Sequence, residues 1–358
     1  MEEERHGPEV LTDTIRFSFP DPDRELASVR LHQDLVRPRN GPDFVLLPDV
    51  KGWVLHFPRL EVARMEYKIE LVHPGGGSEL ICDPWNPARV GGAFGDKSVV
   101  ELPGYEPPPW INLDPPAGSI EPFEVNSRAV RTRVGGLMWA SAGTGPDDVL
   151  PMLIAHDGPE YAELSGLTKF LDVCVAEGRL PAMRAALLAP PGDRDETYSA
   201  SAAYSRALAH EILPALGEMA PTAHGRTMRV GMGASLGALA LLHTHRRYPA
   251  SLGSLYLQSG SFFRQRFDKQ EAGFPRFRRI ARFVGQVLSA EDWAHPIPVT
   301  MTCGGIEENL ANNHATGGSL VRQGYDVSFV EHPDSHNYTS WRDTLDPHLV
   351  DLLAKAWA

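Results

Sequence analysis

A G-x-S-x-G segment, Gly233-Ala-Ser-Leu-Gly237, constrains the fold of this chain more than any other feature. A short apolar run over 228–232 precedes it, and an Ala- and Leu-rich stretch that stops at Pro249 follows it. Strand, tight turn and helix are the context in which a serine hydroxyl is exposed on a strained turn. The pattern predicts that Ser235 is a nucleophile at a helix N-terminus; the alternative is a glycine-rich turn with a buried serine.

Bulk composition sets limits on the kind of protein. The chain has 358 residues, of which 42% are hydrophobic, so we expect a globular protein of two domains with one sizeable core. The N-terminus is acidic and has no apolar core, and no apolar run approaches the roughly 20 residues of a membrane helix. These features predict a cytoplasmic protein without a membrane partner.

Charge and cysteine content narrow the partners further. The net charge of −12 argues against nucleic acid and anionic membranes as bulk partners. The three cysteines, Cys82, Cys174 and Cys303, are widely spaced and form no CxxC pair. We therefore predict no disulfide framework and no metal site. We also expect no cofactor. The sequence gives no indication of oligomeric state.

The first third of the chain has a β pattern after a loose, polar lead-in over residues 1–26. Apolar residues alternate with charged ones over 64–71, which is typical of a strand with one wet face. Shorter candidate strands lie between turn-formers: Leu26–Leu35, Asp43–Leu47, Gly52–Phe57 and Ser98–Leu102. Residues 1–120 are predicted to form a small antiparallel β-sandwich and most of a proline-rich linker. The stiff proline-rich connector is expected over 103–122. We expect Trp110 to pack this connector against one domain.

Residues 121–358 show the alternation of an α/β domain. The apolar runs of strand length are Val149–Ala155, Ala185–Ala189, Met228–Met232, Gly253–Leu257, Val299–Thr302 and Val327–Val330. The helical segments lie near Leu167–Glu177, Ser199–Leu216, Leu236–Tyr248, Phe277–Leu288, Thr316–Gln323 and Pro347–Ala356. Runs that are apolar on both faces predict a mostly parallel sheet covered by helices.

An acid and a base follow the serine in the order that a Ser-acid-His triad requires on such a sheet. Glu307 and Glu308 come after the run 299–302, and His332 and His336 come after the run 327–330. His336 is the predicted base, because His332 precedes a proline at the strand end. The two glutamates are adjacent, and only one of them can face the histidine. The N–H of Leu236 is the predicted first oxyanion donor, with a second from the loop 156–160.

Several motifs in order resemble the Putative esterase family of α/β-hydrolases, most of all its enterochelin (ferric siderophore) esterase branch. These are Leu153-Ile-Ala-His-Asp-Gly-Pro-Glu-Tyr161, Arg194 with Tyr198, the elbow, Gln258-Ser-Gly-Ser-Phe-Phe263, Gly304-x-x-Glu307, and His336 with Trp341-Arg342. Asp83-Pro-Trp-Asn-Pro87 and Glu101-Leu-Pro-Gly104 resemble the early-set immunoglobulin-like domain that precedes the hydrolase in that branch.

The resemblance implies a serine esterase that works through an acyl-enzyme, with Ser235 as nucleophile, Glu307 as acid and His336 as base. Glu308 stays the alternate acid. The chain departs from the family pattern at Asp334-Ser335 and Asn337 around the histidine, and at Pro159. Proline has no N–H, so the second oxyanion donor must be Gly158 or Glu160.

The substrate is expected to be a small-molecule ester, and an anionic one is an option. A basic segment over 264–282 carries Arg264, Arg266, Lys269, Arg276, Arg278, Arg279 and Arg282. Its alternative reading is a solvated amphipathic helix. Candidate substrate-binding residues are Asp157, Arg194, Phe262, Phe263 and Trp341. Two other functions stay open: an acyltransferase of the same fold, and a binding protein whose hydrolase domain is inactive.

Overall fold

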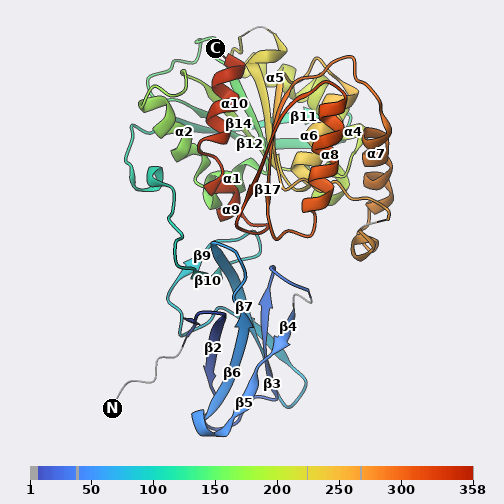
Figure 1. Cartoon of the computed structure of the whole chain (residues 1–358). Helices are drawn as coiled ribbons and strands as arrows, with labels where there is room; N and C mark the ends of the chain where they lie inside the picture. Colours follow the sequence, from blue (N-terminus) through green and yellow to red (C-terminus); the bar gives the residue numbers. More distant parts are fainter. Residues whose placement is uncertain (1–6, 38–39, 224, 267, 358) are drawn as a thin grey trace. The chain divides into compact units, whose positions relative to one another are not determined.

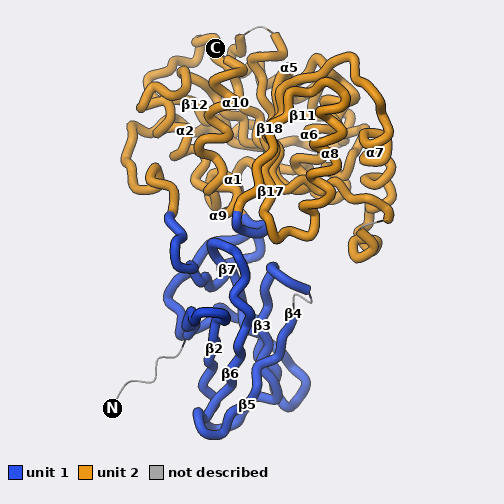
Figure 2. The backbone as a smooth tube through the Cα atoms, in the orientation of Figure 1, with its two compact units in different colours: residues 1–106, 333–337 blue, residues 107–332, 338–358 orange. Residues whose placement is uncertain are grey.

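The chain forms two compact units in the computed structural model, which describes residues 7–37, 40–223, 225–266 and 268–357. Unit 1 comprises Met1–Glu106 together with the short segment Pro333–Asn337, and unit 2 comprises Pro107–His332 and Tyr338–Ala358 (Figure 2). The predicted boundary at residue 120 stays a prediction, whereas the compact units divide between Glu106 and Pro107. The return of the chain to unit 1 at Pro333–Asn337 has no counterpart in the sequence predictions.

Unit 1 consists of two antiparallel sheets (Figure 1). The first has the order β1-β2-β6-β5, with β1 Glu9–Val10, β2 Thr14–Pro20, β5 Val45–Leu47 and β6 Gly52–Pro58. The second has the order β4-β3-β7-β10-β9 with β8 beside β7; the strands are β3 Ser28–Gln33, β4 Asn40–Asp43, β7 Arg64–Val72, β8 Ser78–Ile81, β9 Arg89–Val90 and β10 Lys97–Glu101.

The two sheets share a core that begins within the predicted lead-in. Ile15 and Phe17 on β2 are each 1% exposed, and the ring of Phe17 lies 4.9 Å from that of Tyr67 on β7. The expectation of a loose segment was therefore wrong for residues 14–20, whose apolar residues alternate with polar ones as a strand requires. The immunoglobulin-like assignment of this unit stays a prediction.

Unit 2 is built on an eight-stranded sheet with the order β11-β12-β14-β13-β15-β16-β17-β18. The strands are β11 Ser119–Ser127, β12 Thr132–Ala140, β13 Met152–His156, β14 Arg184–Leu188, β15 Arg229–Ala234, β16 Ser254–Gln258, β17 Pro298–Gly304 and β18 Asp326–His332. The pairs β11–β12 and β12–β14 are antiparallel, and from β14 to β18 every pair is parallel. The predicted mostly parallel α/β sheet is confirmed.

Helices cover both faces of this sheet (Figure 1). One face carries α1 Gly158–Leu164, α2 Leu167–Ala176, α9 Tyr338–Asp343 and α10 His348–Trp357. The other carries α3 Arg194–Tyr198, α4 Ala202–Ala207, α5 Leu213–Met219, α6 Leu236–Arg247, α7 Phe277–Ser289 and α8 Leu310–Arg322. Along β13, Met152 and Ile154 pack into one core and Leu153 and Ala155 into the other, so the strand is buried on both sides.

Two predicted segments differ from the structure in ways that proline explains. The helix expected over Ser199–Leu216 is divided into α4, a π-helical turn over Leu208–Ile212, and α5, where Pro214 stands in the first turn. The expected connector over 103–122 ends early, because β11 begins at Ser119; β11 is an edge strand, which accommodates Pro122. Trp110 packs as predicted, with its ring 5.1 Å from that of Phe170 on α2.

Candidate active site

The G-x-S-x-G segment forms a sharp turn between β15 and α6. Ser235 has φ 55° and ψ −122°, a conformation that is strained for a residue with a Cβ. Two backbone hydrogen bonds hold the turn: the Ser235 N–H donates to the Gln258 carbonyl at 2.9 Å, and the Ser261 N–H donates to the Ser235 carbonyl at 3.1 Å. A strained serine that neighbouring strands hold in place is the geometry of a nucleophile elbow.

The glycines of the elbow are required by close approach. A Cβ at Gly233 would lie 2.9 Å from the carbonyl carbon of Gly237, and a Cβ at Gly237 would lie 3.1 Å from the Cβ of His156. The first contact draws the strand and the helix together across the serine. The second brings the helix against the loop after β13, which is where the second oxyanion donor was expected.

His156 fastens this loop to the elbow and is not a base. Its Nδ1 donates to the Gly237 carbonyl at 3.0 Å, and its Nε2 accepts from the Tyr204 hydroxyl at 2.8 Å. Burial lowers the pKa of His156 to about 4, so the ring is neutral at pH 7. A neutral, fully engaged imidazole fixes the position of the β13–α1 loop.

Asp157 and Arg194, both predicted to bind substrate, bind each other. Arg194 Nε donates to Asp157 Oδ1 at 2.8 Å and Nη2 donates to Oδ2 at 2.7 Å, a two-pronged pair. Asp157 is 3% exposed and adopts a left-handed conformation with φ 51°. The pair therefore braces the turn that leads from β13 into α1, and the substrate role of either residue stays a prediction.

The two predicted oxyanion donors are each the first residue of a helix. Leu236 opens α6 and Gly158 opens α1, and the first N–H groups of a helix have no acceptor within it. Pro159 occupies the next position, where the missing N–H costs the helix nothing. A Cβ at residue 158 would lie 2.2 Å from the Cα of Leu187 on β14, so only glycine fits between the loop and the sheet.

The two candidate acids have different surroundings. Glu307 is 8% exposed, and its Oε1 accepts from the Ser259 hydroxyl at 2.6 Å and from the Gly304 N–H at 2.8 Å. Ser259 in turn accepts from Trp341 Nε1 at 3.0 Å. Glu308 is exposed. The structure thus places Glu307 at the carboxyl end of the sheet and Glu308 at the surface, and which of the two is the acid stays a prediction.

Ser259 and Ser261 are not among the predicted site residues, but each contacts one of them. Ser259 joins Glu307 to Trp341, and the hydroxyl of Ser261 lies 3.0 Å from that of Ser235. Both belong to the Gln258-Ser-Gly-Ser motif, which was noted only as a family resemblance. The signal that pointed to them was their place directly after β16, the neighbour of both β15 and β17.

The histidine candidates separate by unit. His332 ends β18 in unit 2, where its Nε2 lies 2.5 Å from the Ser340 hydroxyl. His336 is half-buried and belongs to the segment Pro333–Asn337 of unit 1. That segment leaves the sheet at the carboxyl end of β18 and re-enters unit 2 at α9.

The remaining predicted substrate residues, Phe262, Phe263 and Trp341, differ in burial. Phe262 is fully buried in the core on the α6 side, and Trp341 is 6% exposed and engaged with Ser259. Phe263 is half-buried, with its ring 6.1 Å from Phe274 and 6.2 Å from Phe277. The substrate-binding roles of Phe262, Phe263 and Trp341 stay predictions.

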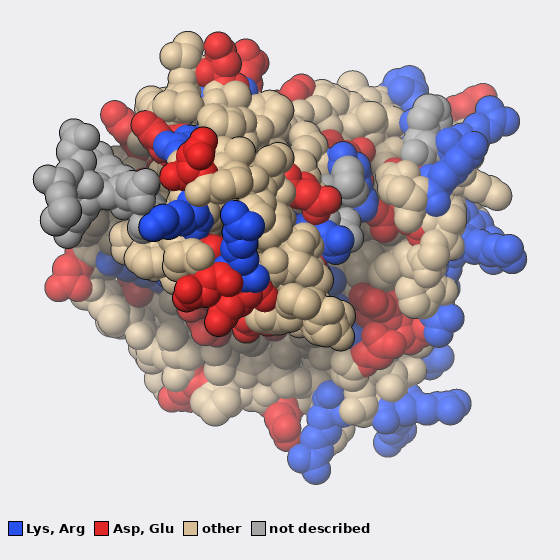
Figure 3. Space-filling view, turned by 90° about the horizontal axis from the view of Figure 1, so that it is seen from below, with Lys and Arg blue, Asp and Glu red and all other residues tan. Residues whose placement is uncertain are grey.

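Some arginines of the basic segment form ion pairs, and others are exposed. Arg276 and Arg279 both pair with Glu196 on α3, the latter at 2.7 Å. The helix α7 buries Phe277 and Phe283, as an amphipathic helix does. Arg266, Arg278 and Arg282 are exposed, and Lys and Arg side chains gather along the right-hand margin of Figure 3, the side on which α7 lies in Figure 1.

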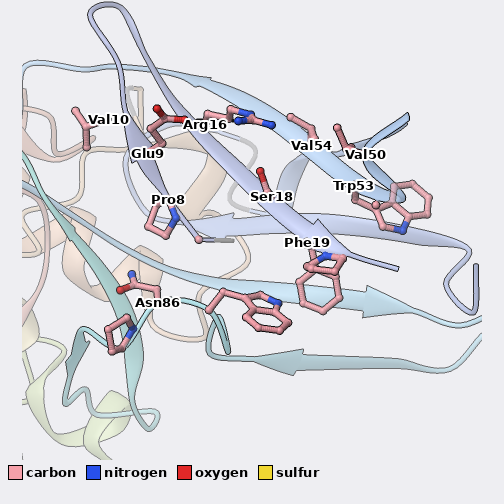
Figure 4. Close-up of a pocket in the computed structure, with 15 residues that line it drawn as sticks. Pro8, Glu9, Val10, Arg16, Ser18, Phe19, Val50, Trp53, Val54 and Asn86 are labelled. Carbon is pink, nitrogen blue, oxygen red and sulfur yellow. Dashed lines mark ion pairs between the residues drawn. The ribbon is translucent and has the colours of Figure 1, made fainter. Parts of the chain in front are cut away.

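Unit 1 contains a hollow of its own, with a volume of about 570 Å³ (Figure 4). Its walls come from β1, β2 and β6 and from the turn around Trp85. The Nε1 of Trp53 donates to buried Asp21 at 2.9 Å, and Arg16 pairs with Glu9 at 3.6 Å. None of the predicted site residues lines it.

Known proteins with similar sequences include esterases. Residues 145–272 match the model of the family described as Putative esterase. The Iron(III) enterobactin esterase of Dickeya dadantii is 28% identical over 204 residues, 54% of this chain and 46% of that protein. The match thus spans less than half of the Dickeya relative. An uncharacterized protein, YjcH, of Bacillus subtilis is 23% identical over 252 residues, 67% of this chain and all of that protein.

A solved structure shares the fold over nearly the whole length. The enterochelin esterase of Shigella flexneri superposes with a TM-score of 0.78, covering 99% of this chain and 97% of that chain at 19% identity. Sheet order and elbow together correspond to an α/β-hydrolase-like fold. The match over residues 145–272 and the relatives support the predicted resemblance to the Putative esterase family and its enterochelin esterase-like branch, and the resemblance is confirmed.

Proposed function

We propose that this chain is a serine carboxylic-ester hydrolase in which Ser235, Glu307 and His336 form the catalytic triad. The observation that carries the proposal is the strained Ser235, held at φ 55° between β15 and α6 by two glycines and two backbone hydrogen bonds. Strain of this kind persists where the surrounding structure fixes it, and it is a feature of nucleophile turns. The family match supports the reaction class.

Sheet topology supports the choice of partners. Ser235, Glu307 and His336 follow β15, β17 and β18, which run parallel in one sheet. The loops that carry them therefore leave the sheet at the same edge, where ligands bind in open α/β sheets. Glu307 is the only one of the two adjacent glutamates that is buried there, and His332 is already engaged with Ser340.

The proposed reaction proceeds through an acyl-enzyme. His336 accepts the proton of the Ser235 hydroxyl as Ser235 attacks the ester carbonyl, and Glu307 stabilises the resulting imidazolium. The N–H groups of Leu236 and Gly158 bind the oxyanion. The alcohol leaves with the proton from His336. Water, activated by His336, then releases the acid and restores the serine.

Active-site labelling tests the nucleophile. A fluorophosphonate should add one adduct to the wild type, seen by intact mass, and none to Ser235→Ala. Ser261→Ala is the matched control, because it removes the neighbouring hydroxyl 3.0 Å away and should still take a single adduct. Labelling of Ser235→Ala, or full hydrolysis of a p-nitrophenyl ester by that variant, would contradict the proposal. Adding an alcohol acceptor distinguishes hydrolysis from acyl transfer.

The substrate we propose is an anionic ester of the siderophore type. The proposal is supported by the similarity to the Iron(III) enterobactin esterase of Dickeya dadantii and by the exposed arginines at positions 266, 278 and 282. The test compares kcat/KM for ferric catecholate esters with that for neutral aryl esters in wild type and in a triple Arg→Ala variant at those positions. A selective rise of KM for the anionic esters is expected, and equal loss for both classes would exclude an electrostatic role.

A further inference from the structure

A buried arginine of unit 1 holds the segment that carries His336. This segment, Pro333–Asn337, clusters with unit 1 although β18 and α9 on either side of it belong to unit 2 (Figure 2). Arg64, the first residue of β7, is 2% exposed. Its Nη2 donates to Asp334 Oδ2 at 2.9 Å and to Asn337 Oδ1 at 3.0 Å. One guanidinium thus binds a residue on each side of His336.

The backbone of the segment is fixed by further contacts. The N–H of Ala63, next to Arg64, donates to the Pro333 carbonyl at 2.5 Å. Within the segment, the Ser335 N–H donates to Asp334 Oδ1 at 2.7 Å, and the Asn337 N–H donates to the Ser335 carbonyl at 3.0 Å. Asp334, Ser335 and Asn337 are all buried, whereas His336 is half-buried. The segment is therefore a tight turn in which His336 is less buried than the three polar residues around it.

The charges around Arg64 form a chain within unit 1. Arg64 lies 3.5 Å from Glu66, which lies 3.4 Å from Lys97, which pairs with Asp34 at 3.0 Å. Burial raises the pKa of Glu66, with its two cationic neighbours opposing the rise. A buried ion pair is costly to form and weak evidence for stability, and its best-attested use is to select one geometry. Here the geometry it selects is that of the histidine segment.

Asp334 and Asn337, which bind Arg64, are among the residues at which this chain departs from the family pattern. Asp334-Ser335 and Asn337 were noted as departures around the histidine, with no reason apparent in the sequence. In the structure, Asp334 and Asn337 supply the acceptors for the guanidinium. Asp334 and Asn337 are therefore tied to the buried arginine.

We propose that Arg64 is a positioning residue for His336. It acts through Asp334 and Asn337 to hold the backbone on either side of His336 in one conformation. This role rests on the proposed function, since it presupposes that His336 is the base. It assigns a part in catalysis to a strand of the N-terminal unit, far from the elbow in sequence.

Kinetics of an Arg64→Met variant test the proposal on the full-length protein with a p-nitrophenyl ester. We expect kcat to fall roughly 10- to 100-fold while KM stays within about threefold, because a displaced base slows chemistry without removing substrate contacts. The rate of fluorophosphonate labelling should fall in parallel. Arg64→Lys keeps the charge but offers a compact donor, so we expect a smaller loss of kcat, about fivefold.

A matched control separates positioning from loss of folding. Trp53→Phe removes a different buried hydrogen bond of unit 1, the one to Asp21, and makes no contact with the segment 333–337. It should lower the unfolding temperature and leave kcat within about twofold. Equal loss of kcat in Trp53→Phe and Arg64→Met would overturn the proposal, and so would an unchanged kcat in folded Arg64→Met.

Two further outcomes are decisive. If Arg64→Met does not fold, Arg64→Lys carries the test, and wild-type kcat in Arg64→Lys would overturn the positioning role. If hydrolysis by the wild type does not depend on Ser235, the proposed function fails, and the role of Arg64 fails with it. Ser235-dependent hydrolysis that is insensitive to Arg64 leaves the triad intact and removes only the positioning role.

Discussion

At the scale of single residues, the site depends on which of two adjacent glutamates is buried. Glu307 and Glu308 follow β17 at three and four residues from its end, and residue type alone does not separate them. Burial does: Glu307 accepts hydrogen bonds from Ser259 and from Gly304, and Glu308 faces solvent. A one-residue choice of this kind depends on the direction of each side chain after the strand ends.

The two glutamates lead to a prediction at the scale of single residues. Glu307→Gln should lower kcat by about 10²–10⁴, because the amide cannot stabilise the imidazolium and can favour the wrong tautomer of the base. Glu308→Gln is the matched control and should stay within about twofold of wild type. Steady-state hydrolysis of a p-nitrophenyl ester measures both. A larger effect at position 308 than at 307 would reverse the assignment of the acid.

At the scale of elements, the sequence predicted the parallel strands and their helices well. Apolar runs from β13 to β17 and the amphipathic helices around them carry a local signal, because burial on both faces requires it. The strand β2 was missed although its apolar residues alternate, and β11 was missed because Pro122 suggested a connector. An edge strand tolerates a proline, and edge position is a property of the sheet and not of the segment.

Packing of α1 against the sheet leads to a stability prediction. Gly158→Ala would place its Cβ 2.2 Å from the Cα of Leu187, a backbone atom that cannot move aside, so α1 must shift. We expect a loss of about 2–4 kcal/mol in the free energy of unfolding, as for overpacked and strained sites. Urea unfolding followed by circular dichroism measures this change.

Gly217→Ala is the control for that substitution. Gly217 lies in α5, and an added Cβ meets nothing within 4 Å. Alanine should therefore raise the stability of the helix by about 0.5–1 kcal/mol. Equal destabilisation at both positions would show that the contact with Leu187 is not what requires glycine at position 158.

At the scale of the whole molecule, buried histidines predict a sensitivity to acid. Burial lowers the pKa of His156, His243 and His245 to about 4 from an ordinary value of 6.5. The unfolded chain therefore binds more protons than the folded one between these values. Stability is full above about pH 6.5 and falls as the pH drops toward 4, by about 1.4 kcal/mol per pH unit for each proton in the difference.

Urea unfolding at pH 7.5, 6 and 5 measures this slope. His243→Gln should make it shallower, by up to about 1.4 kcal/mol per pH unit. His243 is suitable because its Nδ1 contacts the Ser205 hydroxyl at 2.7 Å and the ring packs on Phe283, away from the elbow. A slope that is the same in the variant and the wild type would show that His243 is protonated equally in both states.

Domain organisation was the least predictable level. Composition separated a β-rich first part from an α/β second part, and both are present. The assignment of Pro333–Asn337 to the first unit depends on contacts between residues such as Arg64 and Asp334, which are 270 positions apart. No periodicity or local pattern encodes a contact at that separation.

The return of the chain to its first unit has a consequence for modularity. The two units cannot be exchanged independently, because the N-terminal unit includes five residues, Pro333–Asn337, from the C-terminal part of the chain. A foreign N-terminal unit joined at the Glu106–Pro107 junction would need its own residues to bind Pro333–Asn337, as Arg64 does here. The two halves are thus expected to have been inherited, and to be engineered, as a pair.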